Sequence, residues 1–172
     1  REPLSPSMMR FANENISIEA ARQALHEQNG KYEAIHNQTL STDNLKSSDD
    51  VRGLTEGGQI LQKILEPYRG KIVLLDIWGT WCGPCKDALS HSQEEYERLR
   101  DYPMVYLYLA NHSPEDSWKN VIKEYNVTGD NVAHYNLPEA QQKAVENHVR
   151  INGYPTFRLF NRQGQLLDVD AD

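Results

Sequence analysis

Apolar positions after about residue 57 follow two rhythms that predict alternating strands and helices. Short apolar runs rich in β-branched and aromatic residues predict buried strands, whereas apolar residues three or four positions apart predict helices with one buried face. Strands are expected at residues 71–78, 103–110, 131–137 and 156–161, and helices at residues 58–66, 83–100, 115–125 and 138–149. Ser113 is a candidate cap of the third of these helices, and Pro138 lies in the first turn of the fourth.

The turn at residues 161–164 folds the chain back into Leu166–Val169, which predicts a hairpin at one edge of a sheet. Strands that alternate with helices imply parallel pairing through crossovers, and a hairpin adds antiparallel strands. We therefore predict an α/β fold, with a mixed sheet flanked by helices, over residues 57–172. A chain of 172 residues can bury such a core without support from disulfides.

The first third of the chain, residues 1–56, lacks this alternation and is predicted to be a helical and irregular N-terminal extension. Residues 1–16 are polar and contain prolines, which favours an irregular arm. A helix is expected over Ser17–Gln28, capped by its serine and stopped by the Asn-Gly that follows. Residues 37–53 carry a run of serines and aspartates, which predicts a solvated connection.

Charge and composition exclude several classes of function. The formal net charge is −7 and no cluster of Lys and Arg marks a phosphate-binding face, so nucleic acid is not an expected partner. No apolar run approaches the length of a membrane span, and no signal peptide is present. Because the chain opens on Arg1 and not Met, we expect a mature or excised fragment.

Both cysteines of the chain lie in the run Trp81-Cys82-Gly83-Pro84-Cys85, directly after an apolar strand. A C-x-x-C pair that follows a strand and opens a helix indicates thiol–disulfide exchange. The positive end of the helix dipole favours a thiolate at Cys82, which is the expected nucleophile, and Cys85 can resolve the mixed disulfide. The alternatives are two unreactive thiols or half of a zinc site, although no suitably spaced histidine pair lies near them.

Asp76 is a single carboxylate inside the apolar strand that precedes these cysteines. Desolvation would raise its pKa, so that it could accept the proton of Cys85 during resolution. A hydrogen-bonded, inert carboxylate at a strand end is an equal alternative from the motif alone. Pro155 opens a later strand, and sequence statistics by themselves favour a trans bond before it.

The run from Asp76 to Lys86, together with Tyr154-Pro155-Thr156, resembles the thioredoxin superfamily. The resemblance covers about residues 57–172. It implies that Asp76 is the buried proton acceptor, that Pro155 is cis and packs against the sulfurs, and that the Tyr154 backbone pairs with an extended substrate. The implied substrate-binding residues are Trp81, Gly83, Pro84, Tyr154, Pro155 and Thr156.

Within the superfamily the chain resembles the extracytoplasmic TlpA/ResA-like branch. The Trp-Gly-Thr-Trp-Cys spelling and the inserted helix and strand at about 115–137 carry this resemblance. It implies a bacterial periplasmic or other extracytoplasmic location, with a membrane tether outside this chain.

Three departures from the family pattern are expected to matter. Ala88 stands where many relatives of this branch carry a glutamate, and Ser90 stands where thioredoxins kink the active-site helix with proline, which predicts a straighter helix. No helix is predicted after the last strand, although the superfamily fold ends in one. We expect truncation at the C-terminus in preference to an N-terminal helix that takes this place.

The favoured function is a thiol–disulfide oxidoreductase that reduces protein disulfides, because the Gly-Pro dipeptide between the cysteines resembles reducing thioredoxins. It needs no cofactor beyond the redox-active Cys82–Cys85 disulfide, and its partners would be protein thiols or disulfides and an upstream thiol reductant. The alternative is a Cu(I)- or haem-handling module for cytochrome or oxidase maturation, since paired thiolates suit Cu(I). A peroxidase is disfavoured because the required proline before Thr80 is missing.

Overall fold

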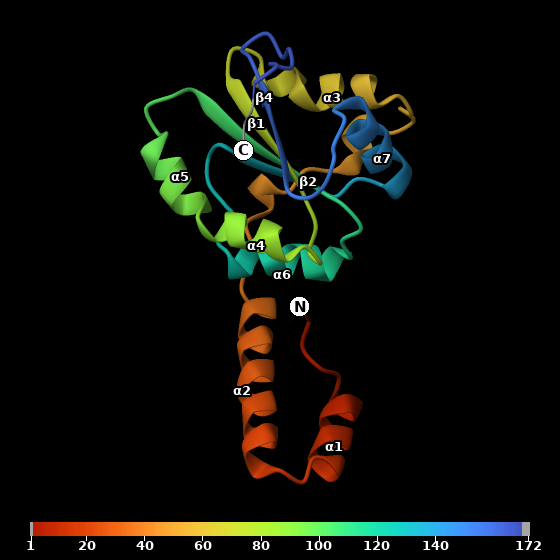
Figure 1. Ribbon diagram of the computed structural model, residues 1–172, viewed down its shortest axis with the longest axis vertical. Helices are drawn as coiled ribbons and strands as arrows, with labels where there is room; N and C mark the ends of the chain where they lie inside the picture. Colours follow the sequence, from red (N-terminus) through yellow and green to blue (C-terminus); the bar gives the residue numbers. More distant parts are fainter. Residues whose placement is uncertain (1, 170–172) are drawn as a thin grey trace.

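A four-stranded mixed sheet forms the centre of the computed structural model, which describes residues 2–169 (Figure 1). The strands are β1 (Ile72–Trp78), β2 (Met104–Ala110), β3 (Val132–Tyr135) and β4 (Thr156–Phe160). Their order across the sheet is β3-β2-β1-β4. The first three strands are mutually parallel, whereas β4 is antiparallel to β1. The predicted α/β class with a mixed sheet is confirmed.

Helices lie on both faces of the sheet and also precede it. The α-helices of the described residues are α1 (Pro6–Asn15), α2 (Glu19–His36), α3 (Gly57–Leu65), α4 (Gly83–Ser90), α5 (Ser92–Arg98), α6 (Glu115–Glu124) and α7 (Glu139–His148). Short 3-10 helices are η1 (Thr42–Asn44), η2 (Ser48–Val51) and η3 (Glu66–Tyr68). No helix in the described part of the chain is both long and apolar enough to cross a membrane.

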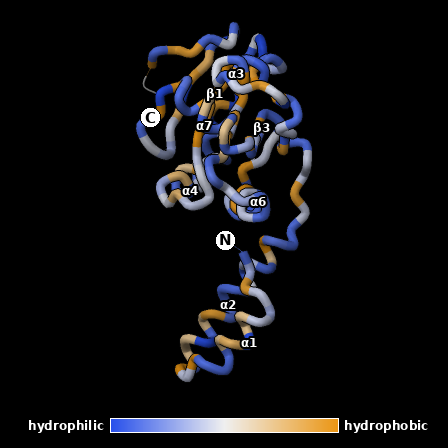
Figure 2. The backbone as a smooth tube through the Cα atoms, turned by 90° about the vertical axis from the view of Figure 1, so that its right-hand side faces the viewer, coloured by the Kyte–Doolittle hydropathy of each residue, from blue (hydrophilic) through white to orange (hydrophobic). Residues whose placement is uncertain are grey.

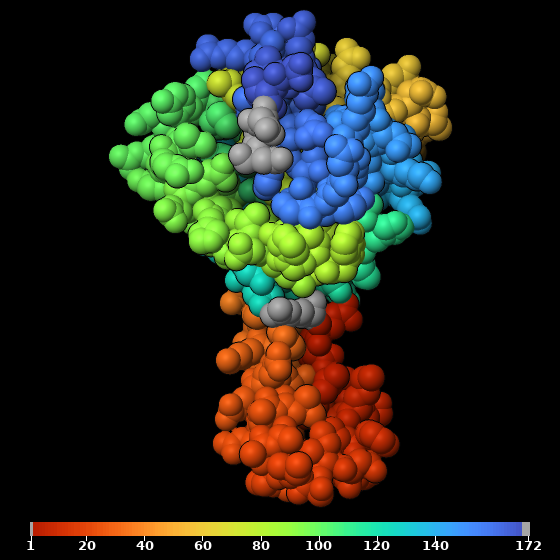
Figure 3. All heavy atoms as spheres, in the orientation of Figure 1, coloured from red at the N-terminus to blue at the C-terminus, as the bar shows by residue number. Residues whose placement is uncertain are grey.

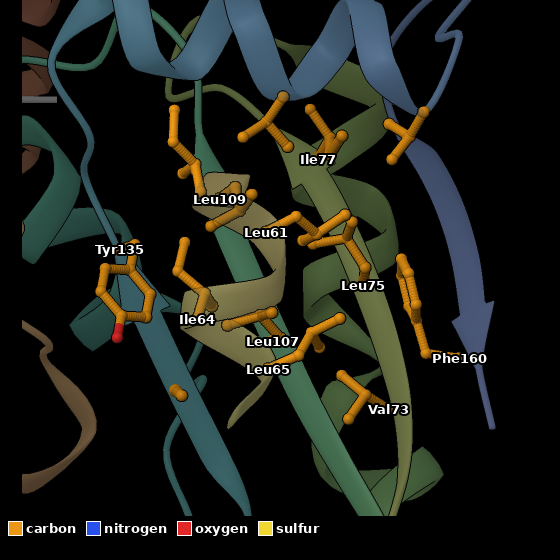
Figure 4. Close-up of a cluster of buried hydrophobic side chains, with 14 of the residues drawn as sticks. Leu61, Ile64, Leu65, Val73, Leu75, Ile77, Leu107, Leu109, Tyr135 and Phe160 are labelled. Atoms are coloured by element: carbon orange, nitrogen blue, oxygen red, sulfur yellow. The ribbon is translucent and has the colours of Figure 1, made fainter. Parts of the chain in front are cut away.

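One face of the sheet packs against α3 and α7. Figure 4 shows the interlocked side chains, which come from α3 and from all four strands. Alternate residues of β1 point to this face because successive side chains of a strand point in opposite directions. They are Val73, Leu75 and Ile77, each at most 2% exposed. A Cβ added at Gly57 would lie only 2.0 Å from the Ala144 carbonyl oxygen, so the backbones of α3 and α7 approach closely there.

The opposite face of the sheet carries the candidate active-site residues. The other set of β1 residues, which includes Asp76 and Trp78, points to this side. A second apolar cluster joins Trp78 and both cysteines to residues of α4, α6 and the middle strands. Trp78 is fully buried.

The N-terminal extension differs from its prediction. Residues 6–15 form α1 and not an irregular arm, with Ser5 Oγ accepting a hydrogen bond from the Met8 N–H. The next helix, α2, begins at Glu19 without a side-chain cap and continues through Gly30 to His36. Glycine weakens a helix interior by only about 1 kcal/mol, so it need not end one.

These two helices form a hairpin that projects away from the sheet. Figures 1 and 3 show it as a narrow lobe below α6, and Figure 2 shows apolar residues scattered among polar ones along it. The hairpin is tied to α6 where Lys123 Nζ donates to the His36 carbonyl oxygen at 2.8 Å. Within residues 2–169, the helices α1 and α2 lie away from the sheet and do not take the place of a C-terminal helix.

The segment 37–53 is largely exposed, as its composition predicts, but two of its residues anchor it to the domain. Val51 is 1% exposed and belongs to the core cluster between the sheet and α3. Asn44 Nδ2 donates to the Val132 carbonyl oxygen at 2.9 Å, and Leu45 forms a parallel bridge with His134 on the edge strand β3. Tertiary contacts therefore hold a mostly solvated connection against the domain at Asn44 and Val51.

Two local predictions in the second half of the chain are wrong. The expected helix 83–100 is broken at His91 into α4 and α5, although Ser90 is not proline. Ser113 does not cap α6, because its Oγ accepts from the Thr80 N–H and donates to the Asn111 carbonyl oxygen.

The predicted hairpin after β4 is confirmed over a short stretch. Phe160 and Leu166 form an antiparallel bridge, and the Leu167 N–H donates to the Leu159 carbonyl oxygen at 2.8 Å. No helix follows β4 up to residue 169.

Candidate active site

A short turn after β1 leads into the N-terminus of α4, where Cys82 is the N-cap residue. Its backbone is extended, with φ −92° and ψ 110°, and its Sγ accepts a hydrogen bond from the Cys85 N–H at 3.2 Å. Pro84 lies in the first turn, where its missing N–H costs no hydrogen bond. The free N–H groups and the positive dipole end favour negative charge on a sulfur at this position.

The two cysteines form a disulfide whose Cα atoms are 5.3 Å apart, so the described form is the oxidised one. Cys82 is 4% exposed and Cys85 is 1% exposed. The intervening Gly83 and Pro84 are exposed at the surface. The structure thus joins the two residues that the sequence predicts to react together, with Cys82 marginally nearer to solvent.

Asp76 lies in the middle of β1 and is 6% exposed. Its Oδ1 has no hydrogen-bond partner within residues 2–169. Burial, with a smaller contribution from the charge of Glu95 on α5, raises the pKa of this carboxyl from 3.8 to about 8. Asp76 shares its face of β1 with Trp78, whose cluster contains both cysteines. The unpartnered Oδ1 and the raised pKa are unlike a fully hydrogen-bonded, inert carboxylate.

The Tyr154–Pro155 peptide bond is cis, as the resemblance implies. Tyr154 packs against the cluster that contains both cysteines. Its ring meets that of Trp81 edge-on, with centroids 5.1 Å apart. Thr156 is buried, and its Oγ1 donates to the Gly153 carbonyl oxygen at 2.6 Å.

Trp81 is held at the surface next to Cys82, as predicted. Its side chain is 53% exposed, and its Nε1 donates to the Asn111 carbonyl oxygen at 3.1 Å. The indole covers Gly79, where an added Cβ would lie 2.5 Å from Nε1. A glycine at this position therefore lets the indole lie flat over the turn between β1 and α4.

A buried carboxylate behind Tyr154 is the main site feature that sequence reasoning missed. Glu146 of α7 is 7% exposed and accepts three hydrogen bonds. Asn111 Nδ2 and Gln142 Nε2 donate to its Oε1 at 2.9 and 3.0 Å, and the Tyr154 hydroxyl donates to its Oε2 at 3.0 Å. The available signal was helical spacing, because Gln142 and Glu146 occupy the same stripe as the buried Val145.

The two sulfurs are the soft donors that a Cu(I) ion would use. Within residues 2–169, no group of three or more His, Cys, Asp or Glu side chains is placed to hold a metal ion. Any metal bound there would therefore rely on the cysteine pair and on ligands from outside this set.

Comparison with known proteins places this geometry in context. A family model described as thioredoxin-like matches residues 70–166. The thiol-disulfide oxidoreductase ResA of Bacillus cereus is 26% identical over 106 residues, which cover 60% of this chain and 57% of that protein. A thioredoxin from Malassezia sympodialis is 30% identical over 104 residues, which cover 59% of this chain and 71% of that protein.

A solved structure shows the same fold. The crystal structure of the thioredoxin domain of a thiol-disulfide oxidoreductase from Bacteroides vulgatus has a TM-score of 0.53 at 24% identity, over 60% of this chain and 71% of that one. The chain spans little more than half the length of the ResA protein that it matches.

Proposed function

Because the chain belongs to the thioredoxin-like family, we propose that it is a thiol–disulfide oxidoreductase that reduces protein disulfides through Cys82 and Cys85. The observation that carries this proposal is the N-cap position of Cys82, where the Cys85 N–H already donates to its sulfur. In the reduced protein the same N–H would stabilise a thiolate. The similarity to proteins named thiol-disulfide oxidoreductase supports the proposed reaction class.

In the first step the Cys82 thiolate attacks one sulfur of a substrate disulfide. The substrate S–S bond breaks, a mixed disulfide forms with Cys82, and the other substrate sulfur leaves as a thiolate that takes a proton from solvent. The Tyr154 backbone N–H and C=O have no backbone partner within residues 2–169, so they are free to pair with an extended substrate segment.

In the second step Cys85 attacks the Cys82 sulfur and releases the second substrate thiolate. The Cys82–Cys85 disulfide forms, so the pair has given two electrons and the substrate has gained them. The Cys85 thiol must lose its proton for this attack, and we propose that the Asp76 carboxylate accepts it. A pKa of about 8 lets this group take up and return a proton near neutral pH.

The insulin reduction assay with dithiothreitol tests the function directly. We expect the chain to accelerate precipitation of the insulin B chain over the blank. The two matched variants differ in outcome: Cys82→Ser should be inactive, whereas Cys85→Ser should accumulate a mixed disulfide that mass spectrometry detects. Activity that survives in Cys82→Ser would refute the proposal. Cu(I) binding by a chain without reductase activity would favour the metal-handling alternative.

We further propose that the protein works outside the bacterial cytoplasm, where an upstream thiol reductant reduces it again. Similarity to ResA supports this proposal. Labelling of the reduced cysteines in intact cells by a membrane-impermeant alkylating reagent tests it. Labelling that requires cell lysis would contradict an extracytoplasmic location.

A further inference from the structure

A cavity of about 920 Å³ opens close to the redox pair, and two of its lining residues are neighbours of that pair. Trp81, which precedes Cys82, and Tyr154, which precedes the cis proline, form one side. The α7 residues Gln142 and Glu146 line the other side. The volume falls within the range of known ligand pockets, about 300–1,000 Å³. A segment paired with the Tyr154 backbone would therefore pass along the mouth of this cavity.

The inner wall of the cavity is rich in hydrogen-bond acceptors. None of the ion pairs between described residues includes Glu146. Its Oε2 accepts one hydrogen bond, from Tyr154, although a carboxylate oxygen can accept two. Gln142 is 2% exposed, and its Oε1 has no partner within residues 2–169. A buried carboxylate without a cation and a buried acceptor without a donor are both unfavourable unless a ligand completes them.

Other charges around the cavity are exposed and therefore act more weakly. Lys143 lines the cavity but is exposed, so solvent and salt screen its charge. His112 lies 3.7 Å from the Glu139 carboxylate, and both of these side chains are mainly in solvent. The buried charge of Glu146 thus dominates the inner wall and disfavours an anionic ligand.

The outer wall favours a cation as well. The half-exposed indole of Trp81 presents a ring at the mouth of the cavity, and Tyr154 supports it edge-on at 5.1 Å. Cations bind the faces of such rings, Trp most strongly, and a guanidinium does so while its N–H groups bond to a carboxylate.

We propose that this cavity is a side-chain subsite that accepts an arginine or lysine next to the reactive cysteine of a protein substrate. The proposal rests on the proposed oxidoreductase function and adds a substrate class to it. The cation would donate to Glu146 Oε2, and its stem would cross the Trp81 ring. Tyr154 would then link the two parts of recognition, since its backbone pairs with the substrate and its hydroxyl holds Glu146.

Single-step trapping in the Cys85→Ser background tests the subsite. Short peptides with one cysteine, activated as a mixed disulfide with a chromophoric aryl thiol, differ only in having Arg, Gln or Glu next to that cysteine. Cys82 attacks the peptide sulfur, the aryl thiolate leaves, and its absorbance gives the rate constant. We expect the Arg peptide to react about tenfold faster than the Gln peptide, which corresponds to about 1.4 kcal/mol, and the Glu peptide to react slowest.

Substitutions in the protein show which residue causes this preference for the Arg peptide. The Arg-to-Gln rate ratio should fall towards one in Glu146→Gln, whatever the absolute rates are. The matched control is Glu94→Gln, the same change on an exposed residue of α5 that does not line the cavity, which should keep the ratio within about twofold because exposed charges are screened. Circular dichroism checks that both variants fold. If Glu146→Gln does not fold, N-acetylarginine amide is added as a competitor to the Cys85→Ser protein, in which Glu146 is unchanged. It should slow the reaction of the Arg peptide and not that of the Gln peptide.

The outcomes separate the subsite from the function. Equal rates for the three peptides, or a ratio that Glu146→Gln leaves unchanged, would overturn the subsite while the oxidoreductase stands. An equal loss of preference in Glu94→Gln would show a long-range charge effect and would also overturn it. Absence of reaction with every peptide would refute the proposed function, and the subsite with it.

Discussion

Replacement of Asp76 by asparagine is expected to stabilise the oxidised protein, and the gain should increase with pH. Asparagine has nearly the same shape but cannot ionise. The carboxyl ionises near pH 3.8 when solvated, and burial raises its pKa in the folded protein to about 8. The folded state therefore binds this proton more tightly than the unfolded state. The contribution of Asp76 to wild-type stability is then most favourable below pH 3.8 and becomes less favourable as the pH rises towards about 8.

The magnitude follows from this difference in pKa. At pH 7 the unfolded carboxyl is ionised while the folded one is mostly protonated, which costs the wild-type protein about 4 kcal/mol of stability relative to a neutral side chain. The same reasoning gives about 2 kcal/mol at pH 5 and about 6 kcal/mol above pH 8, where the difference becomes constant. Such values are a large fraction of a domain's total stability, about 5–15 kcal/mol.

Urea unfolding of the oxidised proteins at pH 5, 7 and 9 measures the effect. The matched control is Asp101→Asn, the same change at an exposed position, which should stay within about 0.5 kcal/mol of wild type. Work on the oxidised form keeps thiol ionisation out of the comparison. A gap between Asp76→Asn and wild type that is constant or shrinks with increasing pH would show that this carboxyl is not held protonated by the fold.

Four further substitutions test other parts of the structure. Gly57→Ala should lower the free energy of unfolding by about 2 kcal/mol or more because its Cβ would meet the α7 backbone at 2.0 Å. Gly30→Ala, in open space on α2, should raise helix stability by about 0.5–1 kcal/mol. Urea unfolding and circular dichroism measure both. Gly79→Ala should displace the Trp81 indole and lower kcat/KM for insulin, and unchanged tryptophan emission would contradict this. His134 is buried with its pKa lowered to about 4, so its own contribution to stability should fall by about 3 kcal/mol between pH 6.5 and 4. In urea unfolding, the stability of His134→Gln relative to wild type should therefore rise by about this amount over the same range.

The sheet and the reactive cysteines could be predicted because their signals are local. The apolar run of β1 is covered on both faces, and the Cys-Gly-Pro-Cys motif follows it where a helix must begin. The burial of Asn44 and Val51 within the otherwise exposed segment 37–53 could not be predicted, since Asn44 meets β3, which is distant in sequence, and Val51 enters the core that α3 forms with the sheet. The break at His91 also lacks a local signal, because no proline or glycine marks it.

Glu146 shows why the rest of the site was missed. A glutamate on a helix is most simply assigned to a solvated face, and only its spacing from Val145 and Val149 indicates burial. Its three donors come from α7 itself, from the loop after β2 and from the residue before Pro155. No pattern in a single sequence brings these segments together.

Asp76 and His134 contribute to stability with opposite dependence on pH. Acidification from pH 6.5 to 4 removes stability through His134 and restores it through Asp76, so the two contributions oppose each other over this range. Above pH 6.5 the His134 contribution is nearly constant, whereas the Asp76 contribution becomes less favourable until about pH 8. The carboxylate form that we propose as the acceptor of the Cys85 proton is thus gained in the same range where this group lowers the stability of the fold. A neutral side chain would avoid this loss, so the proposed proton transfer would give a reason for a buried carboxyl at this position.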